Sequence, residues 1–429
     1  MNETIFALSS GSPPAGIGVI RISGPDAGAA LIALAGRLPE PRRATTASLR
    51  NADGEVLDRA LVLWLPGPAT VTGEDMAELH CHGGRAVIAA VEGALAAMPK
   101  LRRATSGEFT RRAFVNGKID LAEAEGLADL LGAETELQRK SAIAMAGGAF
   151  SHVVESWRER LLASSAAIEA VLDFSDEDDV AGLPDEFAQN LASLRHEIAD
   201  WLKSPRAETL REGYKVVLAG PPNAGKSTLF NALVEYDAAI VTPIAGTTRD
   251  VLSQSVAIEG VPFSFFDTAG LRDALGDVVE DIGIDRARRA MDKADLVLWL
   301  GPEGSCSDLA TRDVWEIEAR IDLADHAVKV SPHHRVSAET GEGVAVLREA
   351  LVAQARASMP GPGQVAINQR QHRLLAESEL ALAAAERQTD PLLVAENLRL
   401  ARLSFDALLG RTTNEDMLDA LFGRFCIGK

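Results

Sequence analysis

The sequence has 429 residues, with 43 lysines and arginines against 62 aspartates and glutamates, which gives a formal net charge of −19. At about 150 residues per domain, this length predicts two to three domains. The apolar fraction of 47% and the charged fraction of 24% exclude wholesale disorder. No apolar run reaches the ~18 residues of a membrane span, and the acidic balance argues against non-specific coating of nucleic acid.

The N-terminal segment shows no targeting pattern. It lacks the basic start and the apolar run of a signal peptide. Three cysteines, Cys81, Cys306 and Cys426, are too few for a disulfide framework in a chain of this length. We therefore expect a cytoplasmic protein that does not associate with membranes.

Residues 1–117 alternate short apolar runs with turn residues. Gly18–Ile22 and Ala60–Leu65 are typical of strands, and Val87–Met98 has a helical pattern. We expect a small α/β domain here.

Long helical patterns follow in residues 118–213 and return in residues 360–429. Apolar residues recur at helical spacing from Phe150 to Val171 and again from Phe187 to Trp201. Thr412 and Glu415 have the spacing of a capping box for the last helix. These two segments predict one all-helical domain, interrupted in sequence.

Residues 214–359 instead alternate strands, loops and helices. Lys215–Ala219, Leu296–Leu300 and Ala327–Val330 are predicted as core strands, and Val251–Ile258 with Val261–Phe266 as a hairpin. Insertion of such a domain is tolerated because domain termini often lie close together. The predicted fold is therefore a multidomain α/β and α protein with an inserted Ras-like P-loop domain.

Gly220–Ser227 matches G-x-x-x-x-G-K-[ST] between a predicted strand and a predicted helix. Its glycines let backbone N–H groups point at phosphate oxygens, and the helix N-terminus adds positive potential. Lys226 would reach the β and γ phosphates, and the Ser227 hydroxyl would bind Mg²⁺. This motif predicts nucleotide hydrolysis.

Two further loops stand at suitable positions. Asp267 ends a predicted strand and can hold the Mg²⁺ shell, while the Gly270 N–H can meet the γ-phosphate. The second loop, Gly246–Asp250, lies in the sequence between the P-loop and Asp267, and it would place a threonine hydroxyl on the metal. These elements resemble the translation-factor-like GTPases.

Many GTPases of this kind place a glutamine after D-x-A-G to orient the attacking water, but this chain has Leu271 there. A leucine has no polar atom, so another group must orient the water or neutralise charge. The candidates are Arg249, Arg272, Glu280 or a bound monovalent cation.

Six motifs outside the P-loop segment occur in a fixed order. They are I-R-I-S-G-P (Ile20–Pro25), T-G-E-D-M-A-E-L (Thr72–Leu79), H-G-G (His82–Gly84), G-E-F-T-R-R-A-F (Gly107–Phe114), N-G-K-I-D-L-A-E-A-E (Asn116–Glu125) and F-C-I-G-K (Phe425–Lys429). Together with the inserted domain they resemble the tRNA-modifying GTPase MnmE family, also called TrmE, over nearly the whole chain.

The resemblance implies a homodimer joined through the N-terminal domains, each binding 5-formyl- or 5,10-methylene-tetrahydrofolate as one-carbon donor. The matching folate contacts are Arg21, Glu78, Lys118 and Lys429. The resemblance also implies an FAD-containing partner, MnmG, and tRNA as substrate. Cys426 would lie near the folate and the tRNA base.

For the inserted domain, the resemblance implies that K⁺ supplies the charge that an arginine finger supplies elsewhere. The K⁺ ligands would be Asn223, Thr242, Ile244 and Thr247, and the Mg²⁺ ligands Ser227 and Thr248. Glu280 would orient the hydrolytic water, so the expected catalytic residues are Glu280, Lys226 and Thr248. The expected GTP-binding residues are Asn223, Ala224, Gly225, Lys226, Ser227, Thr228, Thr242, Pro243, Ile244, Ala245, Gly246, Thr247, Thr248, Asp267, Thr268, Ala269, Gly270, Ser337 and Ala338.

This chain departs from the family at the guanine-specifying motif N-K-x-D. The predicted strand Ala327–Val330 runs into Ser331–His334, which contains neither the asparagine nor the aspartate that accepts from the base. Ser337 and Ala338 still match the next base-contacting motif. On this alignment we expect hydrolysis to survive with weakened discrimination against XTP and ATP.

Two other clusters have alternative interpretations. Lys100, Arg102, Arg103, Arg111 and Arg112 form either a local tRNA-contact surface or an ordinary solvated face. His80-Cys81-His82 suggests a metal site, but consecutive strand residues rarely converge on one ion, so a structural use is favoured.

The interpretation that covers most motifs is a K⁺-stimulated GTPase that acts with MnmG. It would add an aminomethyl or carboxymethylaminomethyl group to C5 of the wobble uridine of certain tRNAs. One alternative is a ribosome-assembly or regulatory GTPase without modifying activity. Another is a folate-binding regulator with a vestigial nucleotide site.

Overall fold

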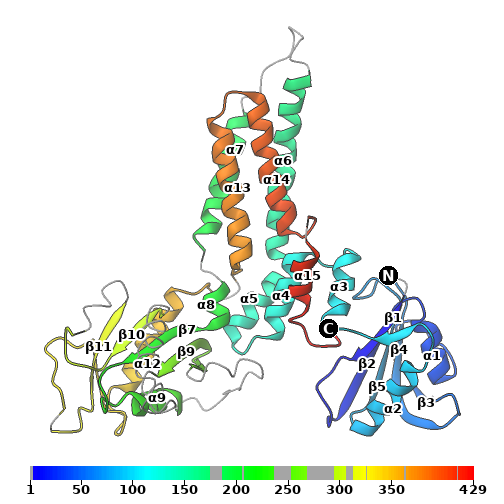
Figure 1. Cartoon of the computed structure of the whole chain (residues 1–429), viewed down its shortest axis with the longest axis horizontal. Coiled ribbons are helices and arrows are strands. Elements are labelled where there is room, and N and C mark those ends of the chain that lie inside the picture. The colour runs from blue at the N-terminus through cyan, green and yellow to red at the C-terminus, as the bar shows by residue number, and fades with distance from the viewer. Residues whose placement is uncertain are drawn as a thin grey trace, which may run out of the picture. The chain divides into compact units, whose positions relative to one another are not determined.

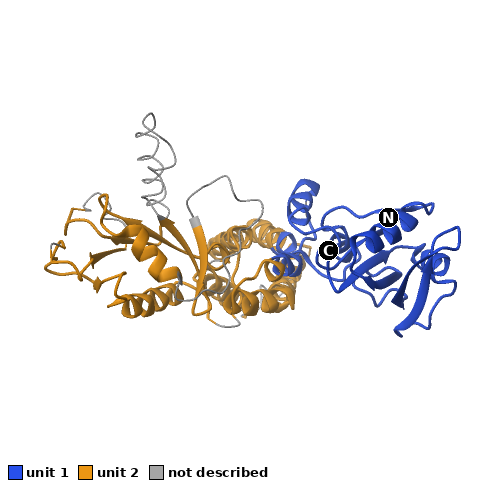
Figure 2. Cartoon of the chain, turned by 90° about the horizontal axis from the view of Figure 1, so that it is seen from below, with its two compact units in different colours: residues 1–128, 405–429 blue, residues 129–404 orange. Residues whose placement is uncertain are grey.

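The structure, a computed structural model, describes residues 3–173, 186–204, 207–235, 253–267, 294–305, 313–324, 326–361, 364–412 and 414–429, with only the backbone described at Glu235, Ser253 and Asp267. Contacts divide the chain into two compact units (Figure 2). Unit 1 contains residues 1–128 and 405–429, and unit 2 contains residues 129–404. The two ends of the chain thus belong to the same unit.

Unit 1 is built on a six-stranded sheet in the order β3-β4-β5-β2-β1-β6. Its strands are β1 (Thr4–Leu8), β2 (Ile17–Ser23), β3 (Thr45–Arg50), β4 (Val56–Leu65), β5 (Met76–His82) and β6 (Leu101–Arg103). Its helices are α1 (Ala27–Ala35), α2 (Arg85–Ala96), α3 (Glu108–Val115) and α15 (Glu415–Phe422), together with most of α4 (Leu121–Leu131). The predicted α/β character of the N-terminal segment is confirmed.

The two faces of this sheet differ because strand side chains alternate. Ile20, Ile22 and Leu79 point into a core that also contains residues of α1 and α2. Their neighbours Arg21 and Glu78 therefore lie on the opposite face. There, Ile5 and Ala7 of β1 pack against Phe109 of α3.

The C-terminal segment closes onto unit 1. Ile427 forms an isolated antiparallel bridge with Ser106. Gly428 has φ = 95°, and an added Cβ there would lie 2.2 Å from the Leu8 carbonyl oxygen. Only glycine fits this passage without moving the backbone.

Unit 2 combines long helices with a second sheet (Figure 1). The helices are α5 (Glu136–Ala146), α6 (Ala149–Asp173), α7 (Glu186–Leu202), α8 (Ala207–Glu212), α13 (Gln369–Arg387) and most of α14 (Pro391–Leu408). α7 packs against both α6 and α13. The predicted stripes account for this packing, since Phe150, Trp157, Leu191 and Ile198 are buried.

The second sheet has the order β12-β11-β10-β7-β9-β8. Its strands are β7 (Tyr214–Ala219), β8 (Ser253–Ile258), β9 (Val261–Asp267), β10 (Leu296–Trp299), β11 (Val314–Ala319) and β12 (His334–Val336). All neighbours are parallel except the β8–β9 hairpin. Helices α9 (Lys226–Glu235) and α12 (Val344–Ala357) contribute to its core.

Two local predictions are wrong. Ala327–Val330 is not a strand: Val328 and Val330 are 74% and 90% exposed, and the core strand is β11, which precedes them. The last helix is capped by Asn414, whose side chain accepts from the Asp416 N–H at 2.7 Å, and not by Thr412. Asparagine caps a helix as well as threonine does, and here it stands directly before the first turn.

Candidate functional site

The P-loop lies where the sequence predicts it, between β7 and α9. Gly220 has φ = 150°, and a Cβ there would lie 3.0 Å from the Gly301 nitrogen, so the loop needs a glycine at this point. Asn223 has φ = 60°, a left-handed conformation that asparagine tolerates better than most residues. The loop therefore turns tightly into the N-terminus of α9, where anions are favoured.

Lys226 begins α9 and is 6% exposed. Its Nζ donates to the carbonyl oxygens of Gly220 and Pro221 at 2.9 and 2.8 Å. These bonds hold the ammonium group inside the loop that would surround a phosphate. Ser227 and Thr228 follow in the first turn of the same helix.

The remaining phosphate-side predictions are only partly described. The backbone of Asp267 ends β9 and pairs with Leu218, close to the start of the P-loop. This is the expected position at the carboxyl ends of neighbouring parallel strands. Outside the described residues lie Thr242, Pro243, Ile244, Ala245, Gly246, Thr247, Thr248, Arg249, Thr268, Ala269, Gly270, Leu271, Arg272 and Glu280.

On the side of the site that would bind the base, the structure offers an aspartate that the sequence analysis did not find. Because the strand is β11, the motif position is Ala319-Arg320-Ile321-Asp322, which begins at the last residue of that strand. Asp322 therefore stands at the aspartate position of N-K-x-D, with Ala319 and Arg320 in place of the asparagine and lysine. The predicted absence of the aspartate is therefore wrong, whereas the asparagine of the motif is replaced by Ala319.

Contacts tie this segment to both sides of a nucleotide site. The Ser337 hydroxyl donates to Asp322 Oδ1 at 2.6 Å and lowers the pKa of that carboxyl. Arg320 Nη1 donates to the Asn223 carbonyl oxygen at 3.0 Å. Ser337 is fully buried, and Ala338, like Ala224 of the P-loop, packs against the core of the sheet.

Charged residues on β11 explain why sequence patterns missed this strand. Glu318 is 4% exposed; burial opposes its ionisation, but hydrogen bonds from His326 and Arg335 prevail and lower its pKa. Glu316 pairs with the buried Lys329, whose Nζ also donates to the Trp299 carbonyl oxygen at 2.8 Å. The alternation of Trp315, Glu316, Ile317 and Glu318 was the available signal for a strand.

The N-terminal predictions converge on the face of the unit 1 sheet opposite α1 and α2. Arg21 of β2 and Glu78 of β5 are direct cross-strand partners. Arg21 Nε and Nη2 both donate to Glu78 Oε1, at 3.1 and 3.0 Å. Burial raises the pKa of Glu78, but the charge of Arg21 and a bond from His80 outweigh it and lower the pKa.

The C-terminal segment reaches this cluster through Phe109. The Arg21 guanidinium lies 6.0 Å from the centroid of the Phe109 ring, within the range of a cation–π contact. The backbone N–H of Phe109 donates to the Lys429 carbonyl oxygen at 3.2 Å. Cys426 is exposed, and its carbonyl oxygen accepts from Gly107.

Lys118 is connected to the same face through the loop before β5. A Cβ at Gly73 would lie 2.9 Å from Lys118 Cε, so the lysine stem covers this glycine. The next residue, Glu74, accepts from the Ser23 hydroxyl at 2.8 Å, and Ser23 follows Arg21 by two positions on β2. All four residues of the predicted folate set thus belong to one contiguous part of unit 1.

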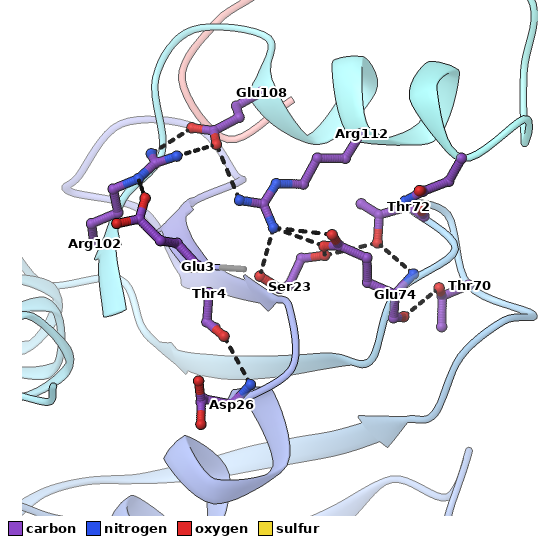
Figure 3. A network of polar contacts seen from close by, with 11 residues as sticks. Glu3, Thr4, Ser23, Asp26, Thr70, Thr72, Glu74, Arg102, Glu108 and Arg112 are labelled. Carbon is purple, nitrogen blue, oxygen red and sulfur yellow. Dashed lines mark hydrogen bonds and ion pairs between the residues drawn. The ribbon is translucent and has the colours of Figure 1, made fainter. Parts of the chain in front are cut away.

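A buried ion network supports that loop (Figure 3). Arg112 is 1% exposed and donates to Glu74 Oε2 at 2.9 Å and to Glu108 Oε1 at 3.2 Å. Burial alone would raise the pKa of Glu108, but hydrogen bonds outweigh this effect and lower the pKa to about 2. The bond from Arg102 contributes most. Sequence reasoning did not assign this network a role.

The network also bears on the predicted basic surface. Arg102 pairs with Glu3 and Glu108, Arg103 with Glu92, and Arg111 with Glu415 and Asp419. Arg112 is buried. Carboxylates therefore pair with the four arginines of this cluster, which weakens its interpretation as a tRNA-contact surface.

In the motif His80-Cys81-His82, the middle side chain points away from the other two. Cys81 points into the core of the sheet, and its pKa is raised to about 12 by burial and the nearby charge of Asp58. His82 pairs with Asp58 at 2.7 Å. Among the described residues there is no group of three potential ligands that could hold a metal, and no helix long and apolar enough to cross a membrane.

Comparison with known proteins agrees with these features. Residues 4–118 match the family described as GTP-binding protein TrmE N-terminus, and residues 121–426 match the MnmE helical domain. The tRNA modification GTPases MnmE of Novosphingobium aromaticivorans and Erythrobacter litoralis are 63% and 60% identical to this chain, each over 100% of both sequences. That of Rhizorhabdus wittichii is 56% identical over 100% of this chain and 97% of its own.

Among solved structures, the G domain of the T. maritima FeoB iron transporter aligns with 33% of this chain and 98% of its own at 27% identity, with a TM-score of 0.24. That score is too low to support an inference. The full-length relatives and the two matched domains are decisive, and the chain belongs to the MnmE family of tRNA modification GTPases.

Proposed function

We propose that this chain is a homodimeric, K⁺-stimulated GTPase that acts with the FAD-containing partner MnmG. Together they would install an aminomethyl or carboxymethylaminomethyl group at C5 of the wobble uridine of certain tRNAs. A tetrahydrofolate bound in the N-terminal domain (residues 1–117) would supply the carbon. GTP hydrolysis in the inserted domain (residues 214–359) would drive a conformational step.

The observation that carries the proposal is the convergence of both chain ends on one face of unit 1. Arg21 and Glu78 lie side by side there, Phe109 connects Arg21 with Lys429, and the Lys118 stem covers the adjoining loop. Arginine and lysine suit the glutamate carboxylates of a folate, and a carboxylate can accept from a ring N–H. A GTPase switch that only assembles ribosomes has no need of such a set.

In the inserted domain, the P-loop and the base-side contacts support GTP as the substrate. Lys226 would bind the β and γ phosphates, and Ser227 with Thr248 would hold Mg²⁺. Asp322 would accept from two donors of the guanine ring. This carboxyl is ionised at neutral pH, as an aspartate normally is, and can therefore accept both.

The proposed K⁺ site begins at Asn223. Its left-handed conformation and the bond from Arg320 to its carbonyl oxygen fix this residue at the edge of the P-loop. Hard cations prefer oxygen ligands, which the Asn223 amide and the loop of Thr242, Ile244 and Thr247 offer. K⁺ would supply positive charge to the transition state, and Glu280 would orient the water.

Deletion of this chain is expected to remove the C5 substituent from wobble uridine, measured by mass spectrometry of the tRNA. Re-expression of the wild-type chain should restore it. The Lys226→Ala variant should not, because loss of the phosphate-binding ammonium slows hydrolysis on the order of 100-fold.

A control variant is available in Lys203→Ala, which changes an exposed lysine that pairs only with Asp200 among the described residues, and it should restore the modification fully. Unchanged tRNA in the deletion strain would contradict the proposal. It would favour a ribosome-assembly or regulatory switch.

A further inference from the structure

The carboxylate of Glu78 has a second partner besides Arg21. His80 lies two residues further along β5 on the same face of the sheet, and its Nε2 is 3.2 Å from Glu78 Oε2. Arg21 uses only Oε1. The two oxygens of Glu78 are therefore held separately, one by β2 and one by its own strand.

A count of lone pairs shows what this leaves for a ligand. A carboxylate offers about four acceptor positions, two on each oxygen. On Glu78, Arg21 fills two on Oε1 and His80 fills one on Oε2. With respect to the part of the chain that the structure describes, one position remains, on Oε2, and the side chain is 18% exposed, so a ligand can reach it.

The surroundings suit a flat heteroaromatic ring. The cross-strand neighbours of His80 are Val19 on β2 and Leu61 on β4, and that of Glu78 on β4 is Leu63. Leu61 is 37% exposed. A ring that rests on these apolar side chains would present a polar edge to Glu78.

The charged groups near His80 come from β2, β4 and its own strand, and on β4 Arg59 lies on this face, diagonally across from His80 in the strand register. On its own strand the next residue on this face is His82, which Asp58 of β4 binds through both its ring and its backbone N–H. From β2 the charged group is Arg21, which is already bound to Glu78. Glu78 is thus the partner through which His80 can act.

We infer that His80 is a positioning residue of the folate site: its donation to Oε2 holds Glu78 so that the last acceptor position meets a ring N–H of the folate. This inference rests on the proposed function. Imidazolium and the neutral ring protonated on Nε2 both donate, so the role persists across neutral pH.

Loss of His80 should also make folate binding depend on pH, through the Glu78 carboxyl. Burial raises its pKa, and the charge of Arg21 and the bond from His80 together keep it below its ordinary value. Without His80, proton uptake by Glu78 shifts to higher pH. A protonated carboxyl has fewer acceptor positions. As the pH falls, folate binding by a variant without His80 should therefore weaken at a higher pH than binding by the wild type.

The test measures binding of 5-formyltetrahydrofolate to the full-length chain by calorimetry from pH 8 to pH 5. His80→Leu removes the donor and is expected to bind at least about tenfold more weakly at pH 7.5. His80→Gln keeps an N–H donor and should remain within about threefold of the wild type. The affinity ratio between wild type and His80→Leu should grow as the pH falls.

His82→Gln is the matched control. It changes a histidine on the same face of the same strand, 75% exposed and bonded to Asp58. Its affinity should equal that of the wild type. GTP hydrolysis and the thermal unfolding of each variant verify that the chain is folded.

Three outcomes decide the matter. Equal affinity of His80→Leu and wild type would overturn the inference. So would equal weakening of His80→Leu and His80→Gln with no pH dependence, because that pattern indicates packing and not donation. A wild-type chain that binds no folate at any pH would instead refute the folate assignment in the proposed function, and the inference with it.

Discussion

Replacing Asp322 with asparagine is expected to lower the affinity for GTP by about 100-fold or more and to raise the affinity for XTP. Guanine presents N1–H and an amino group at C2, and each donates well to a carboxylate. A site whose carboxylate is matched to such donors rejects analogues that lack them. Xanthine carries a carbonyl at C2, which an amide N–H can meet.

The measurement is a fluorescence titration of the wild type and Asp322→Asn with GTP and XTP. Asp313→Asn is the matched control, because Asp313 also carries an exposed carboxylate beside β11 but accepts from Gln354, at 3.1 Å. The control should leave both affinities unchanged. Equal GTP affinity of Asp322→Asn and the wild type would show that the base is bound elsewhere.

Replacing Arg112 with methionine is expected to destabilise the loop before β5 by about 3–5 kcal/mol. Removal of one partner from a buried ion pair leaves the other charges desolvated and uncompensated. Arg112 is 1% exposed and binds both Glu74 and Glu108, so both carboxylates lose a donor. Glu74 in turn holds Ser23, next to the folate contacts.

Hydrogen exchange followed by mass spectrometry on the full-length chain measures this loss in peptides from the loop and from α3. Arg111→Met is the control, since Arg111 forms exposed pairs with Glu415 and Asp419 worth at most about 1 kcal/mol. Equal protection in Arg112→Met and the wild type would mean that the network contributes nothing to the loop.

The nucleotide site could be predicted from sequence where its residues are contiguous. A strand, the Gly220–Ser227 motif and a helix form one local unit, so backbone chemistry alone defines the turn. The base-side carboxylate could not be placed, because the apolar run Ala327–Val330 is a better strand pattern than β11. Charged Glu316 and Glu318 become compatible with β11 only through Lys329, His326 and Arg335.

For the folate contacts, the sequence identifies the residues but not how they pair. Family motifs identify Arg21, Glu78, Lys118 and Lys429, but the register of β2 and β5 is what pairs Arg21 with Glu78. Sequence spacing could not reveal that Glu78 also holds His80. It also could not distinguish a basic surface from the ion network of Arg102 and Arg112, because the partner carboxylates Glu3 and Glu74 come from separate segments.

The central mechanistic claim is that a monovalent cation supplies positive charge to the transition state in a GTPase that has Leu271 in place of the usual glutamine. Its most direct test compares GTP hydrolysis in KCl and NaCl at equal ionic strength. The wild type is expected to be at least about tenfold faster in KCl. Asn223→Gly, which keeps the left-handed backbone but removes the amide oxygen, should lose this difference, whereas equal wild-type rates in the two salts would contradict the mechanism.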